Sequence, residues 1–224
     1  MPMYKRTLLL LALALTLATA FQIDKKMTKV VFFGDSITQA GVQPGGYIAL
    51  MRSRLQTNPR GGEYELIGAG IGGNKVYDLY LRLEKDVLSQ APDVCFLFVG
   101  VNDVWHKRSF GTGTDADKFE GFYAALIEKM QGKGIRCVLV TPACIGEKTD
   151  CTNSLDGELN QYAGIIRRLA AQYRCDLVDL RRAFQEYNIA HNPDNKESGT
   201  LTTDGVHLNA EGNALVADKM MEKL

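Results

Sequence analysis

Residues 30–38 of the chain read VVFFGDSIT. Four bulky apolar residues, typical of a buried strand, lead directly into Gly34, Asp35 and Ser36. A Gly-Asp-Ser sequence after a strand is most often a turn, because glycine and aspartate are favoured there. It can also hold a serine hydroxyl at the mouth of a sheet, where the hydroxyl could act as a nucleophile. The rest of the chain decides between these interpretations.

Short apolar runs alternate with longer amphipathic segments. The expected strands are almost continuously apolar, which is typical of parallel strands covered on both faces; they lie at 29–33, 64–68, 94–99, 135–140 and 177–180. The expected helices lie at 46–56, 76–90, 116–131, 155–173, 181–187 and 210–223. The alternation predicts an α/β fold, a three-layer α/β/α sandwich of flavodoxin-like shape with a roughly five-stranded parallel sheet and right-handed crossovers.

The first twenty residues differ from the rest of the chain. Lys5 and Arg6 precede an apolar run at 8–15, and Ala18-Thr19-Ala20 follows it. This pattern is that of a secretory signal peptide cleaved after Ala20, and the apolar run is shorter than the ~20 residues of a membrane span. We therefore expect a signal peptide at 1–20, a single domain at 21–224, and a mature protein exported to the periplasm or the exterior without a stable membrane span.

The amino-acid composition limits which kinds of molecule this protein is expected to bind. The 224 residues include 26 basic and 26 acidic side chains, so no overall field attracts nucleic acid, and we expect no nucleic-acid partner. The five cysteines form no C-x-x-C pair and only three histidines are present, so no metal site is predicted. Cys144 and Cys151 flank a polar loop and, in an exported protein, could either pair as a disulfide or stay as thiols.

Glycines and small polar residues follow each of the first three expected strands, at 34–36, 68–74 and 100–103. Because ligands bind beyond the carboxyl ends of parallel strands, these segments should converge on one point. Near the C-terminus, Asp204 and His207 lie three residues apart, close enough in a turn for the carboxylate to orient the imidazole. Together with Ser36 they would supply a nucleophile, a general base and an orienting acid.

In this order and at these positions, the four segments resemble the SGNH hydrolases, also called GDSL esterases/lipases, from Val30 to about Ala217. GDSIT carries Ser36 where the family has its nucleophile, GVND carries Asn102 in the third block, and DGVHLN matches the last block. GAGIGGNK matches the glycine block. Its key position is Gly73 or Gly72, and Gly68 stands where the family often has an asparagine.

This resemblance implies a carboxylic ester hydrolase that works through an acyl-enzyme and needs no cofactor. His207 would act as general base and then general acid, with Asp204 orienting it. The backbone N–H groups of Ser36 and Gly73 and the side-chain amide of Asn102 would form the oxyanion hole.

Other residues near these segments have less specific expectations. Asp35 is expected to brace the loop rather than take part in the chemistry. Trp105 and Tyr47 could line the substrate cleft, although packing roles are open to both. His106 is expected at the surface.

The substrate is the least determined feature. A mature chain of about 200 residues leaves little length for a lid, and an open site favours short acyl groups on bulky polar alcohols. Together with export, this suggests removal of acetyl groups from carbohydrate, either small molecules or polysaccharide. The alternative is a lysophospholipase or a general short-chain acylhydrolase.

Three other protein classes are weighed against the hydrolase. Gly68, Gly70 and Gly73 spell the dinucleotide-binding pattern G-x-G-x-x-G, but the next strand ends in Phe98-Val99-Gly100 without the required acid. An α/β-hydrolase needs G-x-S-x-G, which the sequence lacks. A non-enzymatic binding module of flavodoxin-like shape would not explain Asp204 and His207.

Overall fold

Five parallel strands form a single sheet in the computed structural model, which describes residues 27–58 and 61–224. The strands are β1 (Thr28–Gly34), β2 (Tyr64–Gly70), β3 (Val94–Phe98), β4 (Arg136–Val140) and β5 (Asp176–Val178). Their order is β2-β1-β3-β4-β5, and all four pairings are parallel. The predicted signal peptide lies outside the described residues.

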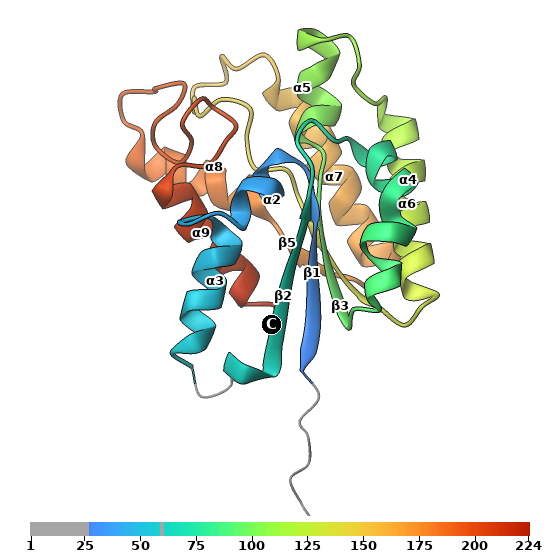
Figure 1. The fold of residues 1–224 in the computed structure, drawn as a ribbon. Helices are drawn as coiled ribbons and strands as arrows, with labels where there is room; N and C mark the ends of the chain where they lie inside the picture. The colour runs from blue at the N-terminus through green and yellow to red at the C-terminus, as the bar shows by residue number, and fades with distance from the viewer. Residues whose placement is uncertain (1–26, 59–60) are drawn as a thin grey trace, which may run out of the picture.

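Helices cover both faces of the sheet (Figure 1). On one side lie α3 (Tyr47–Gln56) and α9 (Ala210–Met221), which contact each other; on the other lie α4 (Val76–Asp86), α6 (Ala116–Gln131) and α7 (Asp156–Tyr173). The remaining helices are α2 (Ser36–Gly41), α5 (Val101–Ser109), α8 (Leu180–His191) and the short 3₁₀ turns Gly61–Glu63 and Leu88–Gln90. The predicted three-layer α/β/α sandwich is confirmed. Among the described residues, no helix has the length and apolarity that crossing a membrane requires.

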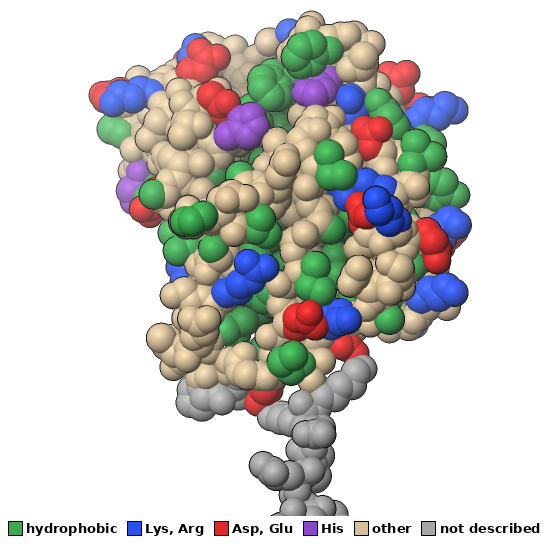
Figure 2. Space-filling model, viewed as in Figure 1, with side chains coloured by type: hydrophobic (Ala, Val, Ile, Leu, Met, Phe, Trp, Pro, Cys, Tyr) green, Lys and Arg blue, Asp and Glu red, His purple; other side chains and the backbone are tan. Residues whose placement is uncertain are grey.

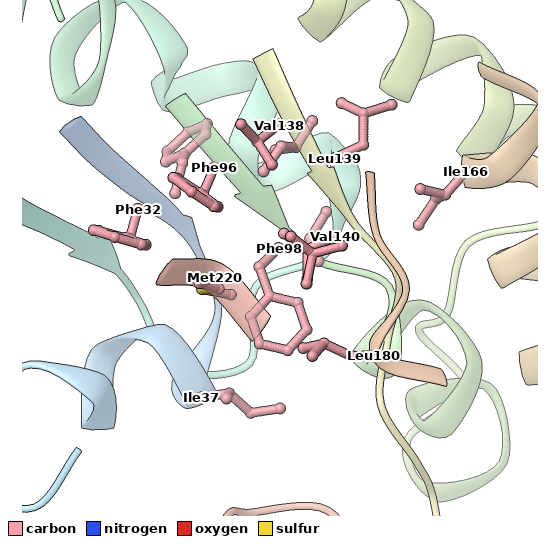
Figure 3. Packing of buried hydrophobic residues seen from close by; sticks show 14 of the residues in the cluster. Phe32, Ile37, Phe96, Phe98, Val138, Leu139, Val140, Ile166, Leu180 and Met220 are labelled. Carbon is pink, nitrogen blue, oxygen red and sulfur yellow. The ribbon is translucent and has the colours of Figure 1, made fainter. Parts of the chain in front are cut away.

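Aromatic side chains of the central strands fill the core. Phe32 of β1 stacks on Phe96 of β3 with ring centroids 4.9 Å apart, and the register places Val138 of β4 next in line. Figure 3 shows these side chains together with Met220 of α9. Every residue of β3 is buried, as its continuous apolar run predicts.

Tyr47 belongs to this core, so its prediction as a substrate-lining residue is wrong. The side chain is fully buried, with its ring edge-on to Phe32 at 5.9 Å. Its hydroxyl donates a hydrogen bond to Thr38 Oγ1 at 3.1 Å. A Cβ at Gly41 would lie 2.6 Å from the ring, so the last residue of α2 packs directly against Tyr47. The sequence places a tyrosine after the glycine loop at 45–46 but does not reveal which way it points.

The helices that differ from the sequence-based expectation include α5 and α4. The sequence predicts a loop at 100–103, but Gly100 turns the chain with a φ of +137° and α5 begins at Val101. The helix expected over 76–90 ends at Asp86 and gives way to the 3₁₀ turn at Leu88–Gln90. The first difference bears on function, because it places Asn102 in the first turn of a helix.

Candidate active site

Ser36 is the first residue of α2, directly after β1. The Asp35 carboxylate caps this helix by accepting a hydrogen bond from the Ile37 N–H at 3.0 Å. Ser36 Oγ lies 3.1 Å from His207 Nε2, although the two residues are 171 positions apart in the sequence. The strand therefore delivers a hydroxyl, rather than only a turn, to the carboxyl edge of the sheet.

Asp204 organises the turn that carries His207. Its Oδ1 accepts hydrogen bonds from the N–H groups of Val206 at 3.0 Å and His207 at 2.7 Å, while Oδ2 lies 2.7 Å from His207 Nδ1. Partial burial opposes ionisation of Asp204, but these hydrogen bonds outweigh it and lower the pKa of the carboxyl group. A proton on Nδ1, which the carboxylate favours, leaves Nε2 free to accept from Ser36. The fold thus brings together the three side chains that the sequence predicts.

The glycine loop after β2 lies over Ser36. A Cβ at Gly72 would stand 3.9 Å from the Ser36 Cβ. The Gly72 N–H donates to Gln39 Oε1 at 2.8 Å, whereas the Gly73 N–H has no hydrogen-bond acceptor among the described residues. Gly73 has a φ of +76°, a left-handed conformation that favours glycine. Because the Gly72 N–H already donates to Gln39, the geometry favours the Gly73 N–H as the one that is free to bind an oxyanion.

Asn102 comes from the third strand end. It is buried, and its Nδ2 donates one hydrogen bond, at 3.1 Å, to the backbone carbonyl of Asn74. An amide nitrogen carries two hydrogens, so one remains for another acceptor. The neighbouring Asp103 is fully buried and accepts from the Val76 N–H at 3.2 Å, which joins the start of α5 to the start of α4. Burial raises the pKa of Asp103 to about 6.

Comparisons with known proteins agree with this arrangement. The family model described as GDSL-like Lipase/Acylhydrolase matches residues 32–215. The chain belongs to the GDSL-like lipase/acylhydrolase family. Its relatives include an acetylxylan esterase of Geobacillus stearothermophilus, 28% identical over 88% of this chain and 93% of that protein. They also include an isoamyl acetate-hydrolyzing esterase 1 homolog of Rattus norvegicus, 24% identical over 83% of this chain and 76% of that protein.

Solved structures of similar proteins extend this result. A crystal structure of an acetyl xylan esterase, AlAXEase, is 63% identical, covers 88% of this chain and 99% of its own, and superposes with a TM-score of 0.86. A catalytic mutant of the Geobacillus stearothermophilus acetylxylan esterase is 26% identical over 88% of this chain and 94% of its own, with a TM-score of 0.78. The resemblance to the SGNH hydrolases is therefore confirmed, and this GDSL protein is a carboxylic ester hydrolase.

The site of this GDSL esterase is open to solvent. The side chains of Asp204 and His207 are 49% and 40% exposed. Trp105 presents its ring edge-on to His207, with centroids 6.3 Å apart, so it stands beside His207; its lining role stays a prediction. Phe110 and Ile71 are exposed nearby in sequence. Figure 2 shows histidine side chains with hydrophobic side chains beside them in the upper part of the molecule, toward the carboxyl ends of the strands, while other hydrophobic side chains are scattered over the same face.

Three contacts of the site carry no signal in the sequence. Gln39 binds the Gly72 N–H, and Asn74 accepts from Asn102. The sequence predicts His106 at the surface, yet it is only part-exposed and its Cε1 would lie 3.8 Å from a Cβ at Gly73. Burial, followed by repulsion from Lys75, lowers the pKa of His106. No spacing rule identifies these contacts, because each joins the glycine loop to a helix that lies far away in the sequence.

The cysteines show no pairing. All five are free thiols: Cys144 is buried and donates to the Gly205 carbonyl at 3.5 Å, whereas Cys151 is exposed. The disulfide that these two could form is therefore absent from the structure, because the buried thiol faces the loop of His207. Within residues 27–58 and 61–224, no group of three or more potential ligands could hold a metal ion.

Proposed function

We propose that this GDSL esterase removes acetyl groups from esterified carbohydrate, with acetylated xylan as the leading substrate. One observation carries the proposal: the hydrogen-bonded series Ser36–His207–Asp204 stands in an open site beside unused amide donors. Two of the relatives described above are named acetylxylan esterases, and a third is named for an acetate ester. An acetyl ester is the feature common to these names.

The chemistry follows from the hydrogen bonds. His207 Nε2 takes the proton of Ser36 as Oγ attacks the acetyl carbonyl, and Asp204 stabilises the imidazolium. The N–H groups of Ser36 and Gly73 and the free Nδ2 hydrogen of Asn102 stabilise the oxyanion. Collapse of this intermediate transfers the proton from His207 to the departing sugar hydroxyl and leaves an acetyl-enzyme. Water, activated by His207, then releases acetate and restores the Ser36 hydroxyl.

The exposure of the site supports a bulky alcohol. With His207 40% exposed, a long polymer can approach while only the acetyl group enters between the loops. Phe110, whose ring contacts His106 with centroids 4.8 Å apart, and Ile71, which precedes Gly72, are exposed and offer apolar surface that can contact the face of a sugar ring. Because His207 and Asp204 are this exposed, the site offers a long acyl chain little burial next to them, which disfavours long-chain lipids.

The test measures acetate released from acetylated xylan by the wild type and by Ser36→Ala. We expect the substitution to lower the rate on the order of 10⁴-fold or more, with the fold retained in circular dichroism. Ser89→Ala, at an exposed serine whose hydroxyl donates to the Lys85 carbonyl, is the matched control and should keep full activity. Retained activity in Ser36→Ala would exclude the proposed nucleophile.

The alternative is a general short-chain acylhydrolase or a lysophospholipase. It is supported by the relative that is named for isoamyl acetate, a small ester. p-Nitrophenyl esters from acetate to palmitate, measured beside acetylated xylan and lysophospholipid, separate the candidates. A preference for chains longer than about eight carbons would reject the carbohydrate proposal.

A further inference from the structure

Arg82 of α4 lies beneath the glycine loop and binds three separate segments. Its side chain is only 13% exposed. The guanidinium donates to Gly34 O at 2.6 Å, to Ala69 O at 3.1 Å, to Asn74 Oδ1 at 2.7 Å and to Asp86 Oδ2 at 2.7 Å. It also stacks over the Phe33 ring, 4.5 Å from the centroid. One side chain thus joins the ends of β1 and β2 to the loop that follows β2.

Asn74 connects Arg82 to the candidate oxyanion hole. Its side-chain oxygen accepts from Arg82 Nε, and its backbone carbonyl accepts from Asn102 Nδ2 at 3.1 Å. Asn74 also directly follows Gly73, the residue whose N–H is free. The position of Asn74 therefore fixes the orientation of both the Asn102 side-chain amide and the Gly73 peptide group. Arg82 in turn fixes the position of Asn74.

We propose that Arg82 is a positioning residue for the oxyanion hole, acting through Asn74 on Asn102 and Gly73; this inference rests on the proposed function. Donors stabilise an oxyanion best when they are already oriented before the reaction. The planar guanidinium directs several N–H groups along fixed directions, which a lysine ammonium cannot reproduce. Burial of the group and its stacking on Phe33 keep that orientation fixed.

The experiment measures kcat and KM for p-nitrophenyl acetate in Arg82→Gln and Arg82→Lys. We expect kcat to fall about 10- to 100-fold in both variants while KM changes less than about threefold, because the interaction acts in the transition state. Asn74→Ala removes the linking acceptor but leaves Arg82 bound to Gly34 and Ala69. It should show the same loss in kcat, so the proposal stays testable even if Arg82→Gln folds poorly.

A double-mutant cycle with Asn102→Ala distinguishes positioning from general stabilisation. Asn102→Ala alone should lower kcat by about 10²–10³. If Arg82 acts through Asn102, adding Arg82→Gln to that variant should lower kcat clearly less than it does in the wild type. A loss of equal size in both backgrounds would overturn the proposal, as would an unchanged kcat in well-folded Arg82→Gln and Asn74→Ala.

Arg136→Gln is the matched control. Arg136 is the first residue of β4, so it lies at the amino ends of the strands, away from the site, and it binds Asp176 at 2.8 Å and the Lys223 carbonyl at 2.7 Å. Its replacement should leave kcat unchanged. Failure of Ser36→Ala to abolish activity would reject the proposed function, whereas normal kcat in the Arg82 and Asn74 variants beside an inactive Ser36→Ala would reject only the role of Arg82.

Discussion

Asp35 is a carboxyl group buried directly beside Ser36. It is 2% exposed and caps α2 through the Ile37 N–H, which agrees with the bracing role expected for it. Burial, aided by repulsion from Asp103, raises its pKa to about 7, against the opposing effects of the Ile37 hydrogen bond and of His207. The residue next to the nucleophile therefore keeps its proton to a higher pH in the folded protein than a solvent-exposed aspartate does.

Asp35→Asn should remove a pH dependence of stability. The native state holds this proton up to about pH 7, whereas the unfolded chain releases it near pH 3.8, so the contribution of Asp35 to stability falls as pH rises through that window. Asparagine keeps an oxygen for the Ile37 N–H but does not ionise. We expect the unfolding free energy of the variant, relative to wild type, to rise by about 2–4 kcal/mol between pH 4 and pH 8.

Urea denaturation at both pH values measures this difference. Asp117→Asn, at an exposed position in the first turn of α6, is the control and should show no such trend. A difference between Asp35→Asn and wild type that stays constant with pH would contradict the raised pKa.

Among the elements of the fold, the loop that carries Asp204 and His207 is held by the loop that follows β4. Glu147 is 1% exposed and accepts hydrogen bonds from Thr200 N–H at 2.8 Å, Leu201 N–H at 2.7 Å and Thr202 Oγ1 at 2.9 Å. Thr202 Oγ1 in turn accepts from the Gly205 N–H at 3.0 Å. The buried carboxylate therefore stabilises the turn on which His207 stands.

Glu147→Gln should loosen this turn. A glutamine amide presents one acceptor oxygen in place of two, so a buried donor loses its partner, at a cost of about 1–3 kcal/mol of unfolding free energy. We also expect a lower kcat with little change in KM, because His207 would be held less firmly. Thermal unfolding and esterase kinetics measure both effects. Glu197→Gln, whose side chain is 77% exposed, should change neither, and a fully active, equally stable Glu147→Gln would contradict this interpretation.

Across the molecule, strand order explains why distant segments share one site. The chain places β2 on one side of β1 and β3 on the other, so the direction of strand order reverses between β1 and β3. Ligands of open parallel sheets bind at such a reversal. Ser36 follows β1 and Asn102 follows β3, and α9 and its preceding loop bring His207 across to them.

The pattern of residues 1–20 predicts that the protein is exported. We propose cleavage after Ala20, because a basic start, a short apolar run and Ala-x-Ala direct secretion. When the full chain is expressed in a bacterial host, mass spectrometry of the exported fraction should give a protein beginning at Phe21. Leu11→Arg interrupts the apolar run and should keep the protein inside the cell. Uncleaved wild-type protein confined to the cytoplasm would contradict the proposal.

Local pattern was enough to predict the features that depend on neighbouring residues. Continuous apolar runs indicated the parallel sheet because both of its faces are covered, and the three-residue spacing of Asp204 and His207 indicated a contact within one turn. The position of Ser36 at a strand end predicted its place at the carboxyl edge, and the resemblance of four short blocks to one family predicted its partner.

Contacts between segments far apart in the chain were settled only by folding in three dimensions. In the folded protein the Gly72 N–H donates to Gln39, whereas the Gly73 N–H is left without an acceptor among the described residues. The Tyr47 side chain points into the core, and the Cys144 thiol contacts the Gly205 carbonyl. Folding also placed Arg82 under the glycine loop. These contacts depend on strand order, crossover and the direction of side chains in packing. None of these leaves a periodic signal in the sequence, because each contact joins elements whose separation along the chain is arbitrary.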